Sequence, residues 1–348
     1  MIELGISTFG ETTEIEGTGI TPAHDERIRD MIEEMKLADE VGLDLYAIGE
    51  HHREDFSVSA PEILLAGGAA VTKNIKLSSA VTVLSSSDPV RVYQQYSTID
   101  AISKGRAEVM VGRGSFTESF PLFGYDLGDY EELFDEKLAM LEKIKDNEML
   151  TWEGKYTQKV ENKGVYPRSV QEDFPIWVAT GGNTESTIKI AQKGLPIAYA
   201  IIGGQYKAFK GLIDYYRAIG RNAGHSNDRL KVASHSWGFV ADTDEEAIKK
   251  YFHPTKQVVD AISKVRPFWR PLTFEQYLNS VGPDGSMLVG SPETVANKLI
   301  DMIETLGLDR FMLHLPLGSM PHEDIMKAIK LFGEEVAPRV REHFKNKK

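Results

Sequence analysis

Two adjacent histidines preceded by a glutamate stand directly after a predicted strand, in the run Gly49-Glu50-His51-His52-Arg53. Histidine can move protons or present a neutral hydrogen-bond donor near pH 7, and the neighbouring carboxylate of Glu50 can orient a ring. The alternatives are two solvated histidines in a polar loop and a metal site. A shared metal ion is disfavoured, because adjacent side chains on an extended segment point to opposite faces. We therefore take His51 and Glu50 as the candidate catalytic pair and predict no metal.

A second candidate is the arginine in the run Val111-Gly112-Arg113-Gly114-Ser115, again at the end of a predicted strand. A guanidinium can hold a phosphate through two parallel hydrogen bonds, and flanking glycines let the backbone approach a ligand closely. The competing interpretation is an ordinary turn that carries a surface arginine, since glycine often marks turns.

A third candidate lies where a strand ending at Thr180 runs into Gly181 and Gly182 and a helix begins after Asn183. The free backbone N–H groups and the positive end of a helix dipole form an anion site, and Ser186 in the first turn adds a hydroxyl. A Gly-Gly turn before a helix is common, and neither a Walker-type loop nor a GxGxxG run accompanies it. Together with Arg113, however, the segment indicates a ligand that carries a phosphate.

The elements that must position these residues alternate between strand and helix along the whole chain. We predict eight strands: Ile2–Ser7, Leu43–Ile48, Lys76–Leu84, Ala107–Val111, Pro175–Ala179, Pro196–Ile202, Lys231–Ala241 and Arg310–Leu315. The predicted helices include Arg27–Val41, Pro61–Thr72, a helix from Asp88-Pro89 to about Ile102, Tyr130–Asn147, Thr184–Lys193, Gln205–Ala223, Asp244–Tyr251 and Glu323–Val336.

This alternation predicts a (β/α)8 TIM barrel with insertions, in which active sites lie beyond the carboxyl ends of the strands. A doubly wound open sheet is the structural alternative. We expect one domain over residues 1–348, with a hairpin or loop excursion at Leu150–Phe174 and an insertion at 252–308. Within that insertion, Val265–Gly290 is the candidate lid, because it carries Trp269, Phe274 and Tyr277. His235 and Trp237 are assigned to the barrel interior or rim, and His314, at the end of the eighth strand, is a weaker candidate at the rim.

Composition narrows the classes of function. The 348 residues include 40 Lys and Arg against 52 Asp and Glu, a net charge of −12, which argues against nucleic acid and anionic membranes as partners. The absence of cysteine excludes disulfides and thiolate chemistry. The first ten residues do not read as a signal peptide, and no apolar stretch reaches the roughly 18 residues of a membrane span. We expect a cytoplasmic protein.

With these residues in view, the chain resembles the bacterial luciferase-like family of flavin-dependent monooxygenases. The resemblance covers residues 1 to about 225 in order and spacing, and the C-terminal third matches only loosely. It rests on the following runs: Ala47–His52, Ser79–Leu84 leading to Asp88–Arg91, Ile102–Arg106, Val111–Gly114, Leu122–Gly124 and Trp177–Ala179 through Gly194–Pro196.

The resemblance implies a barrel that binds reduced FMN. Arg113 matches the arginine that holds the flavin phosphate, and Glu50 and His51 match the acidic residue near the flavin and the catalytic histidine. Ala80–Val81 falls where luciferases have a cis, non-proline peptide beneath the isoalloxazine ring, so we expect one here. The phosphate-binding helix start is matched, after Thr180, by Gly181, Gly182, Asn183 and Ser186.

Departures from the luciferase pattern limit what the resemblance implies. Glycine and asparagine replace the glutamate-serine phosphate ligands of luciferases, so backbone N–H groups must supply more of the hydrogen bonds to the phosphate. A luciferase arginine falls on Glu131, which removes a cation from the phosphate site. The reactive cysteine has no counterpart, so light emission is not implied.

The function expected from this resemblance is oxygenation of a small organic substrate with reduced FMN and O2. The alternatives are a deazaflavin-dependent hydride-transfer enzyme of the same fold, a non-catalytic flavin-binding protein and a metal-dependent hydrolase, the last disfavoured for want of a ligand set. Since no Rossmann fingerprint appears, a separate flavin reductase is the expected source of electrons. The resemblance also implies a homodimer built on the helices after the second and third strands, where Gly67-Gly68-Ala69-Ala70 permits close contact, although packing against the chain's own barrel explains these residues too.

Overall fold

Eight parallel strands close into a barrel. The computed structural model describes residues 2–114, 116–266 and 269–347. Around the barrel, each strand pairs in parallel with the next, and β10 pairs with both β9 and β12, which closes the ring. The strands in ring order are β1 (Glu3–Thr8), β2 (Leu45–Ile48), β3 (Lys76–Ser79), β5 (Ala107–Gly112), β8 (Ile176–Thr180), β9 (Ile197–Ala200), β10 (Val232–Val240) and β12 (Arg310–His314). The predicted barrel is confirmed, and the open-sheet alternative is wrong.

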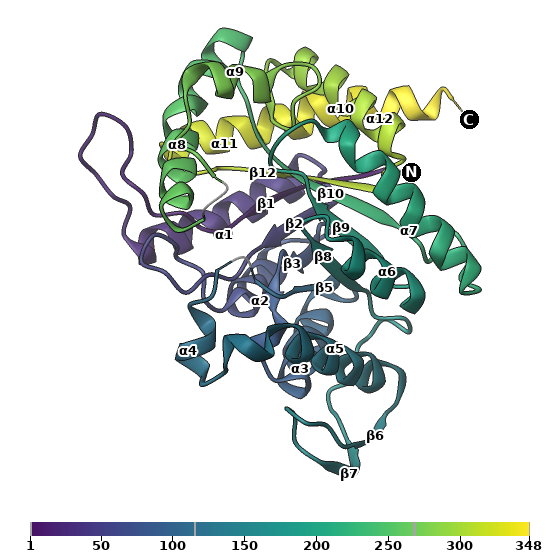
Figure 1. The fold of residues 1–348 in the computed structure, drawn as a ribbon. Helices are drawn as coiled ribbons and strands as arrows, with labels where there is room; N and C mark the ends of the chain where they lie inside the picture. Colours follow the sequence, from purple (N-terminus) through teal and green to yellow (C-terminus); the bar gives the residue numbers. More distant parts are fainter. Residues whose placement is uncertain (1, 115, 267–268, 348) are drawn as a thin grey trace.

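The helices surround this barrel (Figure 1). They are α1 (His24–Glu40), α2 (Pro61–Val71), α3 (Pro89–Ser103), α4 (Ser119–Phe123), α5 (Tyr130–Asp146), α6 (Thr184–Lys193), α7 (Lys210–Asn222), α8 (Asp244–Val265), α9 (Phe274–Val281), α10 (Pro292–Leu306), α11 (His322–Leu331) and α12 (Ala337–Lys345). Several begin and end where the sequence indicates. The Asp88 carboxylate accepts a hydrogen bond from the Arg91 N–H at 3.0 Å, and α6 ends at Gly194 in the left-handed conformation.

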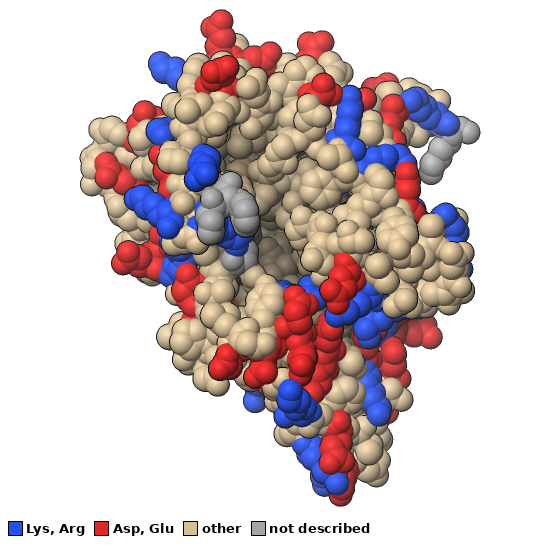
Figure 2. Space-filling model, viewed as in Figure 1, with Lys and Arg blue, Asp and Glu red and all other residues tan. Residues whose placement is uncertain are grey.

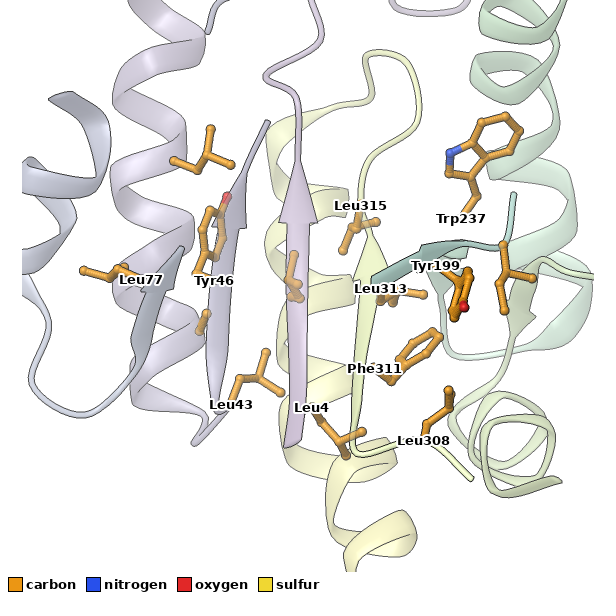
Figure 3. Packing of buried hydrophobic residues seen from close by; sticks show 14 of the residues in the cluster. Leu4, Leu43, Tyr46, Leu77, Tyr199, Trp237, Leu308, Phe311, Leu313 and Leu315 are labelled. Carbon is orange, nitrogen blue, oxygen red and sulfur yellow. The ribbon is translucent and has the colours of Figure 1, made fainter. Parts of the chain in front are cut away.

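The core has two layers. The outer layer fills the space between strands and helices, and Figure 3 shows part of it, including Leu4, Tyr46 and Leu313. The inner layer fills the barrel with Leu45, Ala47, Met110, Trp177, Ala198, Ala233 and Met312. Below it, the buried Arg310 guanidinium pairs with Glu108 at 2.7 Å and lies 4.3 Å from the Trp177 ring centroid. The barrel is therefore filled, and a ligand has access to its mouth only.

Two segments outside the simple alternation differ in how well the sequence anticipates them. The excursion before β8 is a hairpin, as expected, formed by β6 (Met149–Trp152) and β7 (Val160–Gly164). The helix predicted to end at Tyr251 instead continues to Val265 with Pro254 inside it. Pro254 is buried against Gly318, and this packing holds the helix through a residue that usually ends one.

After α8, the described part of residues 252–308 contains α9, α10 and the short strand β11 (Leu288–Gly290). This strand, which the sequence does not predict, pairs in parallel with β10. The strand β4 (Thr82–Val83) likewise separates from β3 and pairs with β5. Among the described residues, no helix is long and apolar enough to cross a membrane.

Candidate active site

His51 lies at the carboxyl end of β2 in an aromatic enclosure. Its ring centroid is 4.6 Å from that of Phe9, 4.4 Å from Phe56 and 5.1 Å from Phe116. Only 7% of the residue is exposed. Burial, and after it the proximity of His314, lower the pKa of His51 to about 3. The ring is therefore neutral at pH 7 and can present one N–H donor and one nitrogen acceptor.

Two roles were expected for Glu50, to orient the ring of His51 or to lie near the flavin. It does not orient His51. Its carboxylate accepts the backbone N–H of Val83 at 2.8 Å and lies 2.7 Å from Nε2 of His52. The Glu50 N–H donates to the carbonyl of Val81 at 3.1 Å. Because adjacent residues of an extended segment point apart, the carboxylate can reach His52 but not His51. Glu50 thus fixes the segment after β3.

That segment contains the expected cis peptide between Ala80 and Val81, so this prediction is confirmed. Two glycines allow it to lie at the mouth. A Cβ on Gly49 would stand 2.7 Å from the Ala80 carbonyl oxygen, and one on Gly112 would stand 2.9 Å from a methyl group of Val81. The strand ends of β2 and β5 therefore approach this peptide as closely as their backbones permit.

Arg113 and the start of α6 meet, as the sequence indicates. The guanidinium donates from Nη1 to Oγ of Ser186 at 3.1 Å and lies 4.6 Å from the Phe134 ring centroid. Its Nη2 lies 2.8 Å from Oε2 of Glu131 and 3.8 Å from Oδ1 of Asp135. The Arg113 Nε is buried without a hydrogen-bond partner. Ser115, which completes the predicted motif, lies outside the described residues.

The turn before α6 has the form of an anion site. The Asn183 side chain accepts the Ser186 N–H at 2.9 Å, which caps the helix, and Thr180 Oγ1 accepts the Gly182 N–H at 3.3 Å. Gly182 has a φ of +103°, and a Cβ on Gly181 would meet nothing within 4 Å. The backbone is thus exposed to a ligand at the helix end whose first N–H groups have no intrahelical partner.

The polar cluster beside His51 contains His235 and His314, which the sequence assigns to the barrel interior or rim, and Glu11, which the sequence does not indicate. His314 at the end of β12 is fully buried, and its Nε2 lies 2.9 Å from Oε1 of Glu11, a residue of the loop after β1. The ring of His235 on β10 is 4.9 Å from that of His314, and its Nε2 is buried without a partner. Burial, and then His314, lower the pKa of His235. Only the position of these histidines on predicted strands could have indicated the cluster.

The proposed lid reaches the mouth from α8. Arg266 lies 5.8 Å from the ring centroid of Phe116 in the loop after β5, and the ring of Trp269 lies 6.1 Å from that of Trp237. Residues 267 and 268 of the predicted lid lie outside the described residues. Tyr277 is fully buried, so α9 packs firmly on α8. Figure 2 shows a hollow on this face of the molecule, between the region of α8 and α9 and the region of α4 and α5.

Known proteins resemble this chain over most of its length. A model of the luciferase-like monooxygenase family matches residues 2–310. The N-acetyl-S-alkylcysteine monooxygenase of Bacillus subtilis (strain 168) is 27% identical over 315 residues, which cover 86% of this chain and 90% of that protein. Within the described parts of the chain, no group of three or more His, Asp and Glu side chains is placed to hold a metal ion.

Solved structures of low identity share the fold. A monooxygenase from Streptomyces bottropensis has a TM-score of 0.84 at 20% identity, and the match covers 97% of this chain and 99% of that one. The oxygenating constituent of 3,6-diketocamphane monooxygenase from Pseudomonas putida, solved with FMN, has a TM-score of 0.74 at 22% identity, covering 98% and 99%. A secondary alcohol dehydrogenase that depends on coenzyme F420 also has a TM-score of 0.74, at 17% identity and the same coverage.

Proposed function

The chain belongs to the luciferase-like monooxygenase family, and from this premise we propose that it binds reduced FMN at the barrel mouth and oxygenates a small organic substrate with O2. The observation that carries the proposal is the meeting of Arg113 with the capped start of α6, on the same mouth as the Ala80–Val81 cis peptide and His51. A phosphate bound by Arg113 and the start of α6 would lie on the same face as the enclosed space around His51, and this supports the proposal.

The residues present fit a flavin phosphate. Arg113 has a buried Nε without a partner, Ser186 offers a hydroxyl, and Gly181 leaves open space where a side chain would stand. Arg113, Thr180, Gly181, Gly182, Asn183 and Ser186 would hold the phosphate, and Ala80 and Val81 would support the ring system. When bound, reduced FMN supplies the two electrons with which one oxygen atom of O2 enters the substrate and the other leaves as water.

The chain's own residues then have three tasks. Phe9, Phe56 and Phe116 surround His51 and exclude water from the reaction space. The neutral His51 ring would donate or accept a hydrogen bond at the substrate's polar atom. Glu50 accepts the Val83 N–H and so fixes the Ala80–Val83 segment, which would support the ring system. Within the candidate lid Val265–Gly290, the part around Trp269 lies near Trp237 and would cover the mouth, whereas α9 packs on α8.

A flavin titration tests the proposal. We expect reduced FMN, added without oxygen, to bind tightly, and Arg113→Ala to weaken that binding by 10-fold or more, about 1.4 kcal/mol or above. Arg221→Ala, at an exposed arginine near the end of α7, is the matched control and should bind like the unchanged protein. Oxygen uptake with aldehydes, ketones, amines and thioethers then searches for the substrate. Failure to bind FMN in either redox state would rule the proposal out.

Hydride transfer with coenzyme F420 is the second candidate, because an F420-dependent dehydrogenase matches this fold as well as the FMN-bound oxygenase does. The same titration separates the two. Tight binding of reduced F420 and none of FMN would favour the dehydrogenase class. For FMN we propose a separate reductase as the source of electrons, whereas in a dehydrogenase the bound substrate would itself transfer the hydride to oxidised F420.

A further inference from the structure

The chain of ion pairs that contains Arg113 carries an excess of negative charge. Two cations, Arg113 and Lys189, stand among three carboxylates, those of Glu131, Asp135 and Glu185, joined in a chain of ion pairs. Two positive and three negative charges leave a net charge of −1 before any phosphate arrives. Figure 2 shows red and blue side chains crowded together beside the hollow, over the region where Figure 1 places α5 and α6.

The carboxylates in this chain are not equivalent. Asp135 lies 2.8 Å from the Lys189 ammonium but 3.8 Å from the Arg113 guanidinium, and Glu185 pairs with Lys189 at 3.1 Å. Glu131 is the carboxylate that holds the arginine, at 2.8 Å from Nη2. Nη2 carries two N–H groups, and the Glu131 carboxylate occupies one of them, so a phosphate oxygen that binds this N–H displaces Glu131.

Glu131 is also the partner that can leave. Its side chain is 61% exposed, in the first turn of α5, whereas that of Arg113 is 12% exposed and fixed against Phe134 and Ser186. Rotation of Glu131 into water therefore leaves the guanidinium in place. The loss of one largely exposed ion pair is a modest cost, and the negative charge that remains nearby still opposes a dianionic phosphate.

We propose that Glu131 competes with the flavin phosphate for Arg113 and so lowers the affinity of the site for FMN relative to flavins without a phosphate. The inference rests on the proposed function, because it concerns the same cofactor site. Arg113 still holds the phosphate, but Glu131 reduces the net gain from that contact, so FMN exchanges more readily than it would without this carboxylate.

Binding of FMN and riboflavin, measured by equilibrium dialysis, tests this role of Glu131 without any turnover. Glu131→Gln removes the charge and keeps the shape, and Glu131→Ala removes the competing oxygen. Glu132→Gln is the matched control, because Glu132 occupies the next position of α5 but pairs with Lys155 and Tyr156. We expect both Glu131 variants to bind FMN about three- to tenfold more tightly, with riboflavin affinity unchanged and the control close to the unchanged protein.

Three results would overturn the inference while leaving the proposed cofactor site intact. They are an FMN affinity that does not rise in the Glu131 variants, an equal gain for riboflavin, and an equal gain in Glu132→Gln. Absence of binding for both flavins to every protein in the series would instead reject the proposed function, and the role of Glu131 with it.

Discussion

The buried position of His51 determines what its ring can do at neutral pH. With a pKa of about 3, the ring is a neutral imidazole at pH 7, which cannot act as a general acid in the way that an imidazolium can and is only a weak base. We therefore assign it a hydrogen-bonding role, which differs from the general acid/base role that the family resemblance implies. On this view, activity should show no inflection from His51 between about pH 5 and 8.

The same pKa predicts how stability depends on pH. An unfolded histidine has a pKa of about 6.5, so below that value the unfolded chain binds a proton that folded His51 rejects, and stability falls as the pH decreases toward 3. At pH 5 the loss from this one residue is about 2 kcal/mol. We expect His51→Phe, which keeps a ring among Phe9, Phe56 and Phe116, to lose less stability between pH 7 and pH 5.

Denaturant unfolding of both proteins at the two pH values measures this difference. His235→Phe should act in the same direction, because burial lowers the pKa of that ring as well. If His51→Phe and the unchanged protein lose the same stability on acidification, His51 is protonated in the folded state and the assigned role is wrong.

At this scale the sequence predicts candidate residues well and their partners poorly. Arg113 and Ser186 were identified from separate strand ends, and they lie 3.1 Å apart. Their meeting follows from the barrel, because strand ends converge at one mouth. The partner of Glu50 could have been inferred from the alternation of side chains in an extended segment, which places Glu50 on the same side as His52 and away from His51. Glu11 lies in an irregular loop with no periodic pattern, so its contact with His314 has no sequence signal.

At the scale of elements, close approach of backbones shapes the mouth. Gly49 directly follows β2, and a Cβ there would meet the ring of Phe9 and stand 2.7 Å from the Ala80 carbonyl oxygen. Ala80 is itself tied to the end of β2, because its N–H donates to the carbonyl of Ile48 at 2.8 Å. We expect Gly49→Ala to lower the free energy of unfolding by about 1–3 kcal/mol and to weaken flavin binding, because the cis peptide segment must move.

Gly67→Ala in α2 is the control for the effect of adding a methyl group. Gly67 is exposed, and its nearest neighbour would be the flexible end of Ile32 at 3.2 Å. Alanine favours a helix interior over glycine by roughly 0.5–1 kcal/mol, so this variant should be as stable as the unchanged protein or more so. Equal thermal stability and equal FMN affinity of Gly49→Ala and the unchanged protein would contradict the close approach.

The elements themselves were predictable because each of the eight barrel strands is a short, largely buried segment that is bounded by turn residues. The errors fall where packing overrides local preference. Pro254 suggests a helix end, yet α8 continues because the residue is buried against Gly318. The three-residue strand β11 is too short for periodicity to mark, and its pairing with β10 depends on contacts across the fold.

At the scale of the molecule, the open question is whether two copies associate through α2 and α3. The glycines that suggested such a contact have another explanation within the chain, since a Cβ on Gly68 would lie 2.4 Å from the sulfur of Met35 in α1. The outer face of these helices is a better argument. It carries a groove of about 310 Å³ in which apolar Ile63, Ala66 and Ile99 lie beside polar Glu62, Arg91 and Gln95, and Ile63 is 65% exposed.

We therefore predict a homodimer whose contact includes Ile63, and light scattering during size exclusion should give twice 38.8 kDa. Ile63→Asp places a charge among the apolar residues of this groove and should shift the protein to monomer. Leu122→Asp is the matched control, because Leu122 is also 65% exposed but lies on α4, beside the barrel mouth. Because the two residues are equally exposed, a general effect of placing a charge at an exposed apolar residue would appear in both variants. Dissociation in Ile63→Asp alone would therefore identify the face of α2 and α3 as the dimer interface. A monomeric unchanged protein, or dissociation in both variants, would reject that face as the interface.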